Sequence, residues 1–288
     1  MFRFCVISIL TVVYAAAAQA CNETALDKSR IVVAGGSITE IIYFLGEQRQ
    51  LVGADTTSTY PEAAKDLPSV GYVRAMSAEG LLSLKPTLIL GEDDMGPPAV
   101  LDQLRHQGVQ SIQISEEHSA AGIISKVRCI AKVLGVPEKA NTLIKGELQP
   151  LADELAQYAS QVQTVRPLRA AVLLNIDQGS PMVAGGDTSG NGLLEMVGLE
   201  NVFADVKKWK SVTRESMILA NPDVVFISDR AVNRLGGLDE LLQDPTLSLT
   251  NAARQNKVLA LDGMAMLGFG PRTIRTALDL TRFLREPS

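Results

Sequence analysis

Residues 71–90 read GYVRAMSAEGLLSLKPTLIL, and a related stretch, KKWKSVTRESMILANPDVVFI, follows 136 positions later at residues 207–227. A second, shorter repeat lies upstream of each copy: the run VAGG at residues 33–36 recurs at residues 183–186. Two copies of one structural unit predict two similar lobes, and a cleft between lobes is a favoured place for a small ligand. The matched pairs within the longer repeat are Ser77 and Thr213, Glu79 and Glu215, Leu82 and Ile218, and Pro86 and Pro222.

The first twenty residues have the features of a secretory signal peptide. Arg3 supplies a positive start, residues 4–17 are apolar, and residues 18–20 (AQA) form a small-x-small cleavage site. The alternatives are an uncleaved anchor and a lipid-modified Cys21, although Gln19 is larger than the residue usual at that place in a lipidation motif. No other stretch approaches the roughly 18 apolar residues that a membrane-spanning helix needs. We therefore expect a secreted chain.

The charge composition excludes one class of partner. The chain carries 27 basic and 32 acidic side chains, a net charge of −5, and it shows no basic stripe. Proteins bind nucleic acid through a concentrated basic surface, so nucleic acid is not an expected partner. A mild negative charge favours solubility instead.

Cysteine and histidine are too few and too scattered to predict a structural metal site. Cleavage after residue 20 leaves Cys21 and Cys129, and neither His106 nor His118 lies near a cysteine in the sequence. An oxidising compartment permits a disulfide between Cys21 and Cys129. The alternative is that Cys129, which falls in an apolar helical pattern, is an ordinary core residue.

Strands alternate with helices of 8–12 residues in both halves of the chain, which indicates an α/β fold of two lobes, each with a parallel sheet and flanking helices. Ser37, followed three residues later by Glu40, has the spacing of a capping box at a helix start. The expected organisation is a signal peptide at 1–20, an N-terminal lobe at 21–136, a connecting helix at 137–163 and a C-terminal lobe at 164–288.

The connecting segment is helical in pattern over about 26 residues from Pro137, which corresponds to about 39 Å at 1.5 Å per residue. A helix of that length reaches from one lobe to the other and joins them rigidly. The alternative is two helices broken near Pro150, because an interior proline usually kinks a helix.

Ligands of open α/β sheets bind at the carboxyl ends of the strands. The segments that precede the two repeat helices are expected at the same edge, with residues 71–74 of the first lobe, which include Tyr72 and Arg74, opposite residues 207–210 of the second, where Trp209 lies among three lysines. A flat, partly aromatic, anionic ligand would suit such a pair of faces. The other segments expected at the cleft are residues 35–37, 91–95, 185–188, 228–230 and 264–272.

The sequence resembles a known family in three places: residues 71–90, the pair Gly236-Gly237 with its following helix, and the run GFGPR at residues 268–272. These resemble the periplasmic haem-binding proteins of bacterial haem ABC importers, within the helical-backbone class that also includes cobalamin and ferric-siderophore carriers. The resemblance covers essentially the whole mature chain. It implies a monomer that binds haem as cargo in the periplasm and delivers it to an ABC permease and its ATPase; cobalamin or a ferric siderophore is the alternative ligand.

The resemblance assigns Tyr72 as the ligand of the haem iron. A phenolate is a hard anionic oxygen donor that suits ferric iron, and tyrosine is an established haem ligand. A phenol needs help to ionise at neutral pH, and a neighbouring guanidinium supplies it by favouring the charged form. Arg74 and Arg230 are the two candidates, and a solvated surface charge is the alternative for each.

Other residues are expected to contact the ligand. Lys208 and Arg272, with Lys207 and Lys210, suit the haem propionates, although a run of lysines is often only solvated. Trp209 and Phe269, with Met264 and Met266, suit the porphyrin faces, although each suits an ordinary core equally. His106 and His118 belong to the first lobe, whereas the relatives that bind a second haem use a histidine of the second lobe, so one haem is expected.

Glu79 and Glu215 occupy equivalent places in the repeat. In carriers of this class, a glutamate at that position of each lobe docks onto arginines of the membrane permease, so the resemblance implies docking for both. Charges on a rim mainly set orientation and encounter rate. The alternative is a first-turn glutamate stabilised by its helix dipole.

An enzyme is the contrasting hypothesis, and the sequence gives it little support. There is no G-x-S-x-G elbow, and the GGS turn at residues 35–37 lacks the lysine of a phosphate-binding loop. The pair Asp93-Asp94 is a common loop feature. We therefore expect a carrier, with a chelatase-like enzyme as the less favoured alternative.

Overall fold

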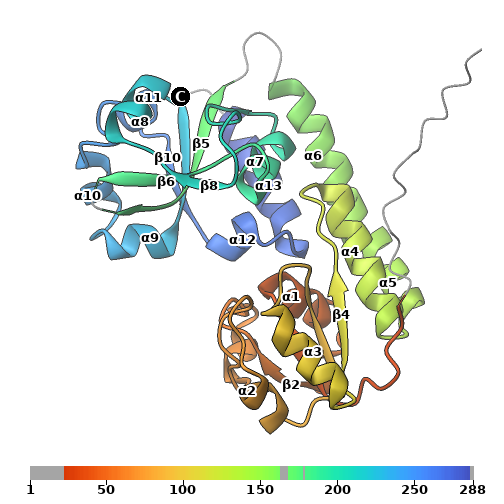
Figure 1. The fold of residues 1–288 in the computed structure, drawn as a ribbon. Coiled ribbons are helices and arrows are strands. Elements are labelled where there is room, and N and C mark those ends of the chain that lie inside the picture. Colours follow the sequence, from red (N-terminus) through yellow and green to blue (C-terminus); the bar gives the residue numbers. More distant parts are fainter. Residues whose placement is uncertain (1–22, 163–167, 178, 286–288) are drawn as a thin grey trace, which may run out of the picture.

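The computed structural model describes residues 23–162, 168–177 and 179–285, and it has two lobes, each built on its own sheet. Figure 1 shows the lobes one above the other, with a helical column beside them. The expected signal peptide and Cys21 lie outside the described residues. The α/β fold with two lobes is confirmed.

The first lobe holds a four-stranded parallel sheet in the order β2-β1-β3-β4. One of its two central strands is β1, whose four residues are all buried, as is usual for a parallel sheet covered by helices on both faces. The elements are β1 Ile31–Ala34, α1 Gly36–Phe44, η1 Gln48–Gln50, β2 Leu51–Ala54, η2 Glu62–Asp66, α2 Ala78–Ser83, β3 Leu88–Glu92, α3 Pro98–His106, β4 Gln110–Ile114 and α4 Ala120–Val133.

The second lobe holds a mixed sheet in the order β10-β9-β5-β6-β8, with β7 paired to β5. The strands β10, β9 and β5 are parallel, whereas β6 runs antiparallel to both β5 and β8. The elements are β5 Arg169–Asp177, β6 Ser180–Ala184, α7 Ser189–Met196, β7 Glu200–Asn201, β8 Trp209–Ser211, α8 Arg214–Ala220, β9 Val224–Ser228, α9 Asp229–Arg234, α10 Leu238–Gln243, α11 Asn251–Arg254, β10 Val258–Leu261, α12 Gly263–Leu267 and α13 Pro271–Arg285.

The segment between the lobes is continuously helical through α5 (Pro137–Leu143), the π-turn η3 (Ile144–Leu148) and α6 (Gln149–Val162). Pro150 cannot donate a backbone hydrogen bond, and its ring crowds the carbonyl one turn earlier. A π-turn widens the helix there and accommodates the proline without a break. Figure 1 shows this column running along both lobes.

The longer repeat is visible in the structure as two matching helix starts. Ser77 caps α2 by accepting a hydrogen bond from the Gly80 N–H at 3.1 Å, and Thr213 caps α8 by accepting one from the Ser216 N–H at 3.2 Å. The strand β3 follows α2 in the first lobe, and β9 follows α8 in the second. Each hydroxyl satisfies an N–H that the helix leaves unpaired.

Two local expectations differ from the structure. The VAGG run at residues 183–186 ends the antiparallel strand β6, whereas its first copy ends the parallel strand β1, so β5 is the spatial counterpart of β1. The expected capping box at Ser37 and Glu40 is absent, because α1 starts earlier and its N-cap is Gly35. Both side chains are thereby left for other contacts.

One hydrophobic core runs through both lobes. It contains Ile31 and Leu90 of the first sheet, Val172 and Phe226 of the second, and Leu155 of α6. The helix α13 contributes to the same cluster and packs against α6 and α1. The lobes are thus joined by packing as well as by the connecting helix.

Cys129 is disulfide-bonded. Its expected partner, Cys21, lies outside the described residues, so the predicted pairing stays a prediction. Among the residues that the structure describes, no helix is both long and apolar enough to cross a membrane.

We expect Phe226→Ala to lower the free energy of unfolding by about 3–5 kcal/mol, because Phe226 is fully buried in β9 and its loss leaves a cavity. Leu219→Ala is the control: Leu219 is 86% exposed, and the change should stay within about 0.5 kcal/mol. Urea denaturation measures both. Equal effects of the two substitutions would contradict the assigned core.

Candidate ligand-binding site

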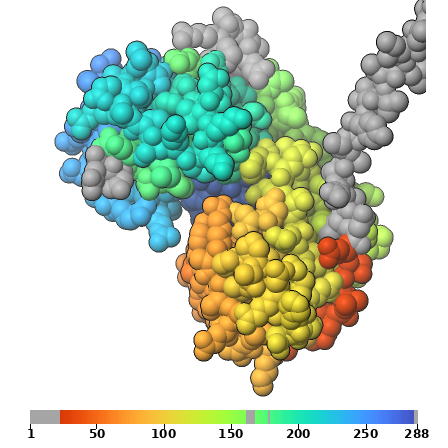
Figure 2. Space-filling view, in the orientation of Figure 1, coloured from red at the N-terminus to blue at the C-terminus, as the bar shows by residue number. Residues whose placement is uncertain are grey.

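A cleft of about 570 Å³ lies between the two lobes and takes its walls from both. Figure 2 shows the surface hollowed between the upper and lower lobes, with residues near the C-terminal end of the colour scale at its back. The first lobe contributes the loops that follow β2, β3 and β4, and the second contributes the turn after β6, the start of β8 and α12. Its size is typical of small-molecule sites.

Tyr72 lies on the first-lobe wall of the cleft and is 45% exposed. Its carbonyl accepts a hydrogen bond from the Ala75 N–H at 2.8 Å, which closes a tight turn. The turn begins at Gly71, where φ is +88°, a conformation that favours glycine. Val73 is buried, and its carbonyl accepts a hydrogen bond from the Gly96 N–H at 2.9 Å, which ties this turn to the loop that follows β3.

Arg74 also lines the cleft, but it is engaged by Asp94. Its Nε donates to the Asp94 carboxylate at 2.6 Å. Although partial burial opposes the shift, this carboxylate raises the pKa of Arg74, so the guanidinium stays charged. The structure therefore brings a tyrosine and a permanently charged arginine to one wall.

The second-lobe wall carries Lys208 and Trp209. Lys208 has a left-handed backbone with φ of +60°, and its N–H donates to the Asp187 side chain. Trp209 starts β8 and packs so closely on Gly190 that a Cβ there would lie 3.1 Å from the indole. A cation and an aromatic ring thus face the tyrosine wall across the cleft.

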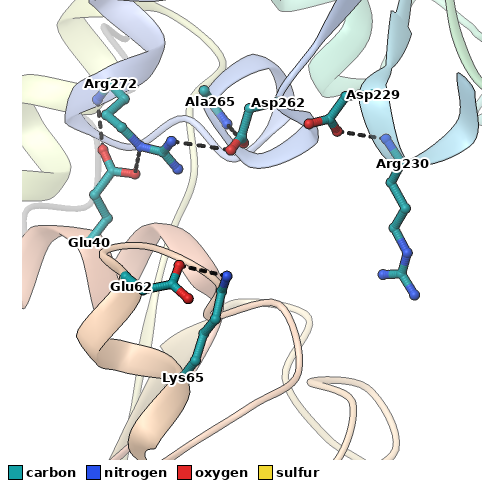
Figure 3. Close-up of polar contacts among 8 residues, drawn as sticks. All are labelled: Glu40, Glu62, Lys65, Asp229, Arg230, Asp262, Ala265 and Arg272. Carbon is teal, nitrogen blue, oxygen red and sulfur yellow. Dashed lines mark hydrogen bonds and ion pairs between the residues drawn. The ribbon is translucent and has the colours of Figure 1, made fainter. Parts of the chain in front are cut away.

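Six expected ligand contacts lie outside the cleft lining: Arg230, Phe269 and Arg272, and also Lys207, Lys210 and the fully buried Met266. Arg272 does not line the cleft; its Nε donates to Glu40 of the first lobe at 2.9 Å. Phe269 is fully buried in the core beside the cleft, with its ring 4.8 Å from that of His118. Arg230, on α9, lies outside the lining and points out of the second lobe, as Figure 3 shows.

Sequence reasoning missed a polar network on the first-lobe side of the cleft. The buried Lys126 ammonium donates to Glu116 and, at 3.2 Å, to the Ser37 hydroxyl, which in turn donates to Glu92 at 2.8 Å. His118 Nε2 lies 3.6 Å from the Glu116 carboxylate. Glu116 and His118 follow β4, so the strand-end rule applied to that strand would have found them. Lys126 gives no such signal, because it lies within an amphipathic helix.

Burial sets the protonation of this network. It raises the pKa of Glu92 to about 7, with help from the negative charge of Glu116 and against the opposing charge of Lys126. Burial alone would also raise the pKa of Glu116. Contacts with His118 and Lys126 outweigh burial, so the pKa of Glu116 is lowered. The network therefore holds one carboxylate firmly ionised and one that titrates near neutrality.

Glu79 and Glu215 are both exposed, and each lies in the first turn of its helix, α2 or α8. Hydrogen bonds from its own backbone N–H and from Thr213 lower the pKa of Glu215. Neither glutamate is among the residues of the cleft. The two glutamates thus place a carboxylate at equivalent positions on the two lobes.

The described residues contain no group of three or more histidine, cysteine, aspartate or glutamate side chains arranged to hold a bare metal ion. The cleft offers a phenol, two nearby cations and an indole, together with His118 and the acidic side chains of Glu92, Asp93, Asp94, Glu116 and Asp187. Such walls suit an organic ligand, or a metal that arrives within one.

A two-lobed α/β fold with a polar cleft at the carboxyl ends of its strands defines a ligand-binding protein of the carrier type. The chain belongs to the periplasmic binding protein family, whose model matches residues 31–265. Members of this family are substrate-binding transport proteins, and the chain is accordingly not an enzyme.

Three known proteins illustrate the similarity. The solved structure of the periplasmic haem-binding protein RhuT from Roseiflexus sp. RS-1 is 36% identical, with a TM-score of 0.80, over 90% of this chain and 98% of that one. A substrate-binding ABC transporter lipoprotein of Bacillus subtilis, YvrC, is 26% identical over 88% of this chain and 79% of its own length. A vitamin B12-binding protein of Yersinia pestis is 29% identical over 69% of each.

We expect Glu92→Gln to remove a pH dependence of stability. The folded protein holds the Glu92 proton more tightly than the unfolded chain, so its contribution to the unfolding free energy falls as pH rises from about 4.5 through about 7. Denaturant unfolding at a series of pH values measures it. Glu147→Gln, at an exposed site, is the control. An unchanged slope in Glu92→Gln would contradict the assignment.

Proposed function

We propose that the chain binds haem in the interlobe cleft, with the Tyr72 phenolate as ligand of the ferric iron. The observation that carries the proposal is an exposed phenol on the wall of a cleft large enough for a flat tetrapyrrole, with Arg74 close by. The 36% identity to a haem-binding protein over nearly the whole chain supports it.

The chemistry of the wall fits a ferric porphyrin. Ferric iron stabilises the deprotonated form of a phenol that it binds, as metal ions do for their acidic ligands. The Arg74 guanidinium adds positive charge on the same wall, and its pairing with Asp94 fixes its position. Arg230 is the second candidate for this role, because its guanidinium points out of the second lobe and has no ion-pair partner among the described residues.

The second-lobe wall supplies the remaining contacts of the proposal. Trp209 offers an aromatic face on which a porphyrin stacks. Lys208 offers an ammonium group that would attract a haem propionate. The first-lobe wall carries the carboxylates Glu92 and Glu116, which would repel a propionate. Arg272 and Phe269 have structural partners, so their contribution to haem binding is indirect.

Cobalamin is the second candidate ligand, because a vitamin B12-binding protein is among the relatives. The carboxylates of Glu92, Asp93 and Asp94 at the cleft would accept hydrogen bonds from amide groups, which edge a corrin but not a haem. Competition between cyanocobalamin and haemin for one protein sample decides between the two ligands.

The proposal includes delivery of haem to an inner-membrane ABC permease and its ATPase. The chain would reach the periplasm through a cleaved signal peptide at 1–20, with lipid attachment at Cys21 as the alternative, and act as a monomer with lobes at 21–136 and 164–288. Glu79 and Glu215 would each dock one lobe onto the permease, since each is an exposed carboxylate at the start of a helix.

We expect haemin added to the purified protein to give a Soret band, and Tyr72→Phe to shift that band and weaken binding by at least about tenfold, because the iron loses its anionic ligand. Tyr60→Phe is the matched control: Tyr60 is 43% exposed but lies outside this cleft. Absorption titration measures both. Identical spectra and affinities for Tyr72→Phe and wild type would refute the ligand.

We expect the double substitution Glu79→Ala with Glu215→Ala to leave haem affinity unchanged and to abolish haem-dependent growth of cells that carry it, because both docking charges are lost while the cleft is intact. Glu62→Ala with Glu240→Ala, two other exposed glutamates on separate lobes, is the control. Normal uptake in the first double variant would contradict the docking role.

A further inference from the structure

An ion pair outside the cleft lining joins the two lobes. Glu40 lies in α1 of the first lobe, and Arg272 lies in the first turn of α13, 232 residues further along. One Glu40 oxygen accepts the Arg272 backbone N–H at 2.6 Å, and the other accepts its Nε–H at 2.9 Å (Figure 3). The carboxylate is therefore held by two donors of one residue.

Neighbouring residues enclose this ion pair and make further contacts with it. Glu40 is only 5% exposed, and the guanidinium carbon lies 3.6 Å from the centre of the Tyr60 ring. A second carboxylate, Asp262, accepts from Arg272 Nη1 at 3.3 Å. Gly270 lies so close that a Cβ there would meet the Glu40 carboxylate at 3.0 Å.

Removal of one partner of such a pair leaves a buried charge without compensation, which is costly. Arginine suits the place because its planar group can contact two carboxylates and stack on a ring together. Its Nη2 atom is buried and has no hydrogen-bond partner among the described residues, and the face-on contact with Tyr60 offsets part of that cost.

The same segment of chain forms the back wall of the cleft. Met264, Leu267 and Gly268 line the cleft a few residues before Arg272. Between them, Phe269 takes a left-handed backbone with φ of +49° and packs on His118 of the first lobe. The position of this wall relative to the first lobe thus depends on where Arg272 is anchored.

We infer that Glu40 and Arg272 form an interlobe clamp that fixes the opening of the cleft and positions its back wall. Both are positioning residues, since neither lines the cleft. The clamp does not depend on which ligand the cleft binds. It explains why the arginine at the end of the GFGPR run contacts a first-lobe helix and does not line the cleft.

The experiment measures the distance between lobes in the ligand-free protein by double electron–electron resonance, with spin labels at Ser83→Cys and Gln243→Cys, two exposed positions on α2 and α10. Arg272→Gln and Glu40→Gln should each broaden the distance distribution and extend it to longer distances. The matched control is Arg282→Gln, which removes another arginine–glutamate pair of α13, to Glu154 of α6, without crossing between lobes.

Arg272→Lys serves as a milder variant in case Arg272→Gln does not fold. It keeps the charge and the backbone hydrogen bond but loses the forked contact and the stacking, so an intermediate broadening is expected. In the haemin complex, Arg272→Gln should release haem on the order of tenfold faster, with its Soret band unmoved. Distance distributions like those of wild type in Arg272→Lys and Glu40→Gln would overturn the clamp, even if haem binding failed for other reasons.

Discussion

The packing of α13 against helices of both lobes sets how the two lobes are held together. The helix belongs to the second half of the chain, yet its buried side chains join a core that includes α1 of the first lobe and α6 of the connecting column. Two lobes joined by one core cannot swing freely about a loop. The cleft is therefore largely preformed, and its walls present their polar groups to one space before any ligand arrives.

Much of this architecture could be predicted from the sequence, because the signals were local. The repeat that pairs Ser77 with Thr213 fixed two equivalent helix starts, and hydrophobic periodicity gave the long helix from Pro137. The helix continues through Pro150 because a π-turn precedes it, and no pattern in the sequence announces that turn. The antiparallel β6 was likewise hidden, since strand direction depends on pairing rather than on composition.

The site was harder to predict where a residue's partner is distant in the sequence. Arg272 looked like a ligand contact because its partner, Glu40, lies 232 residues away and seemed committed to a local cap. Nothing in the sequence singled out Lys126, because its partner Glu116 lies in the loop before its helix, yet Lys126 is buried against that carboxylate. Tyr72 and Trp209 were easier, because both belong to the repeated element that frames the cleft.

The proposed function requires the phenolate of Tyr72 to hold the iron of the bound ligand. Resonance Raman spectroscopy of the ferric haem complex, excited in the phenolate-to-iron charge-transfer band, tests it most directly. We expect tyrosinate vibrations that shift when the protein is labelled with ring-deuterated tyrosine and vanish in Tyr72→Phe. A haem complex without tyrosinate vibrations, or one that keeps them in Tyr72→Phe, would contradict it.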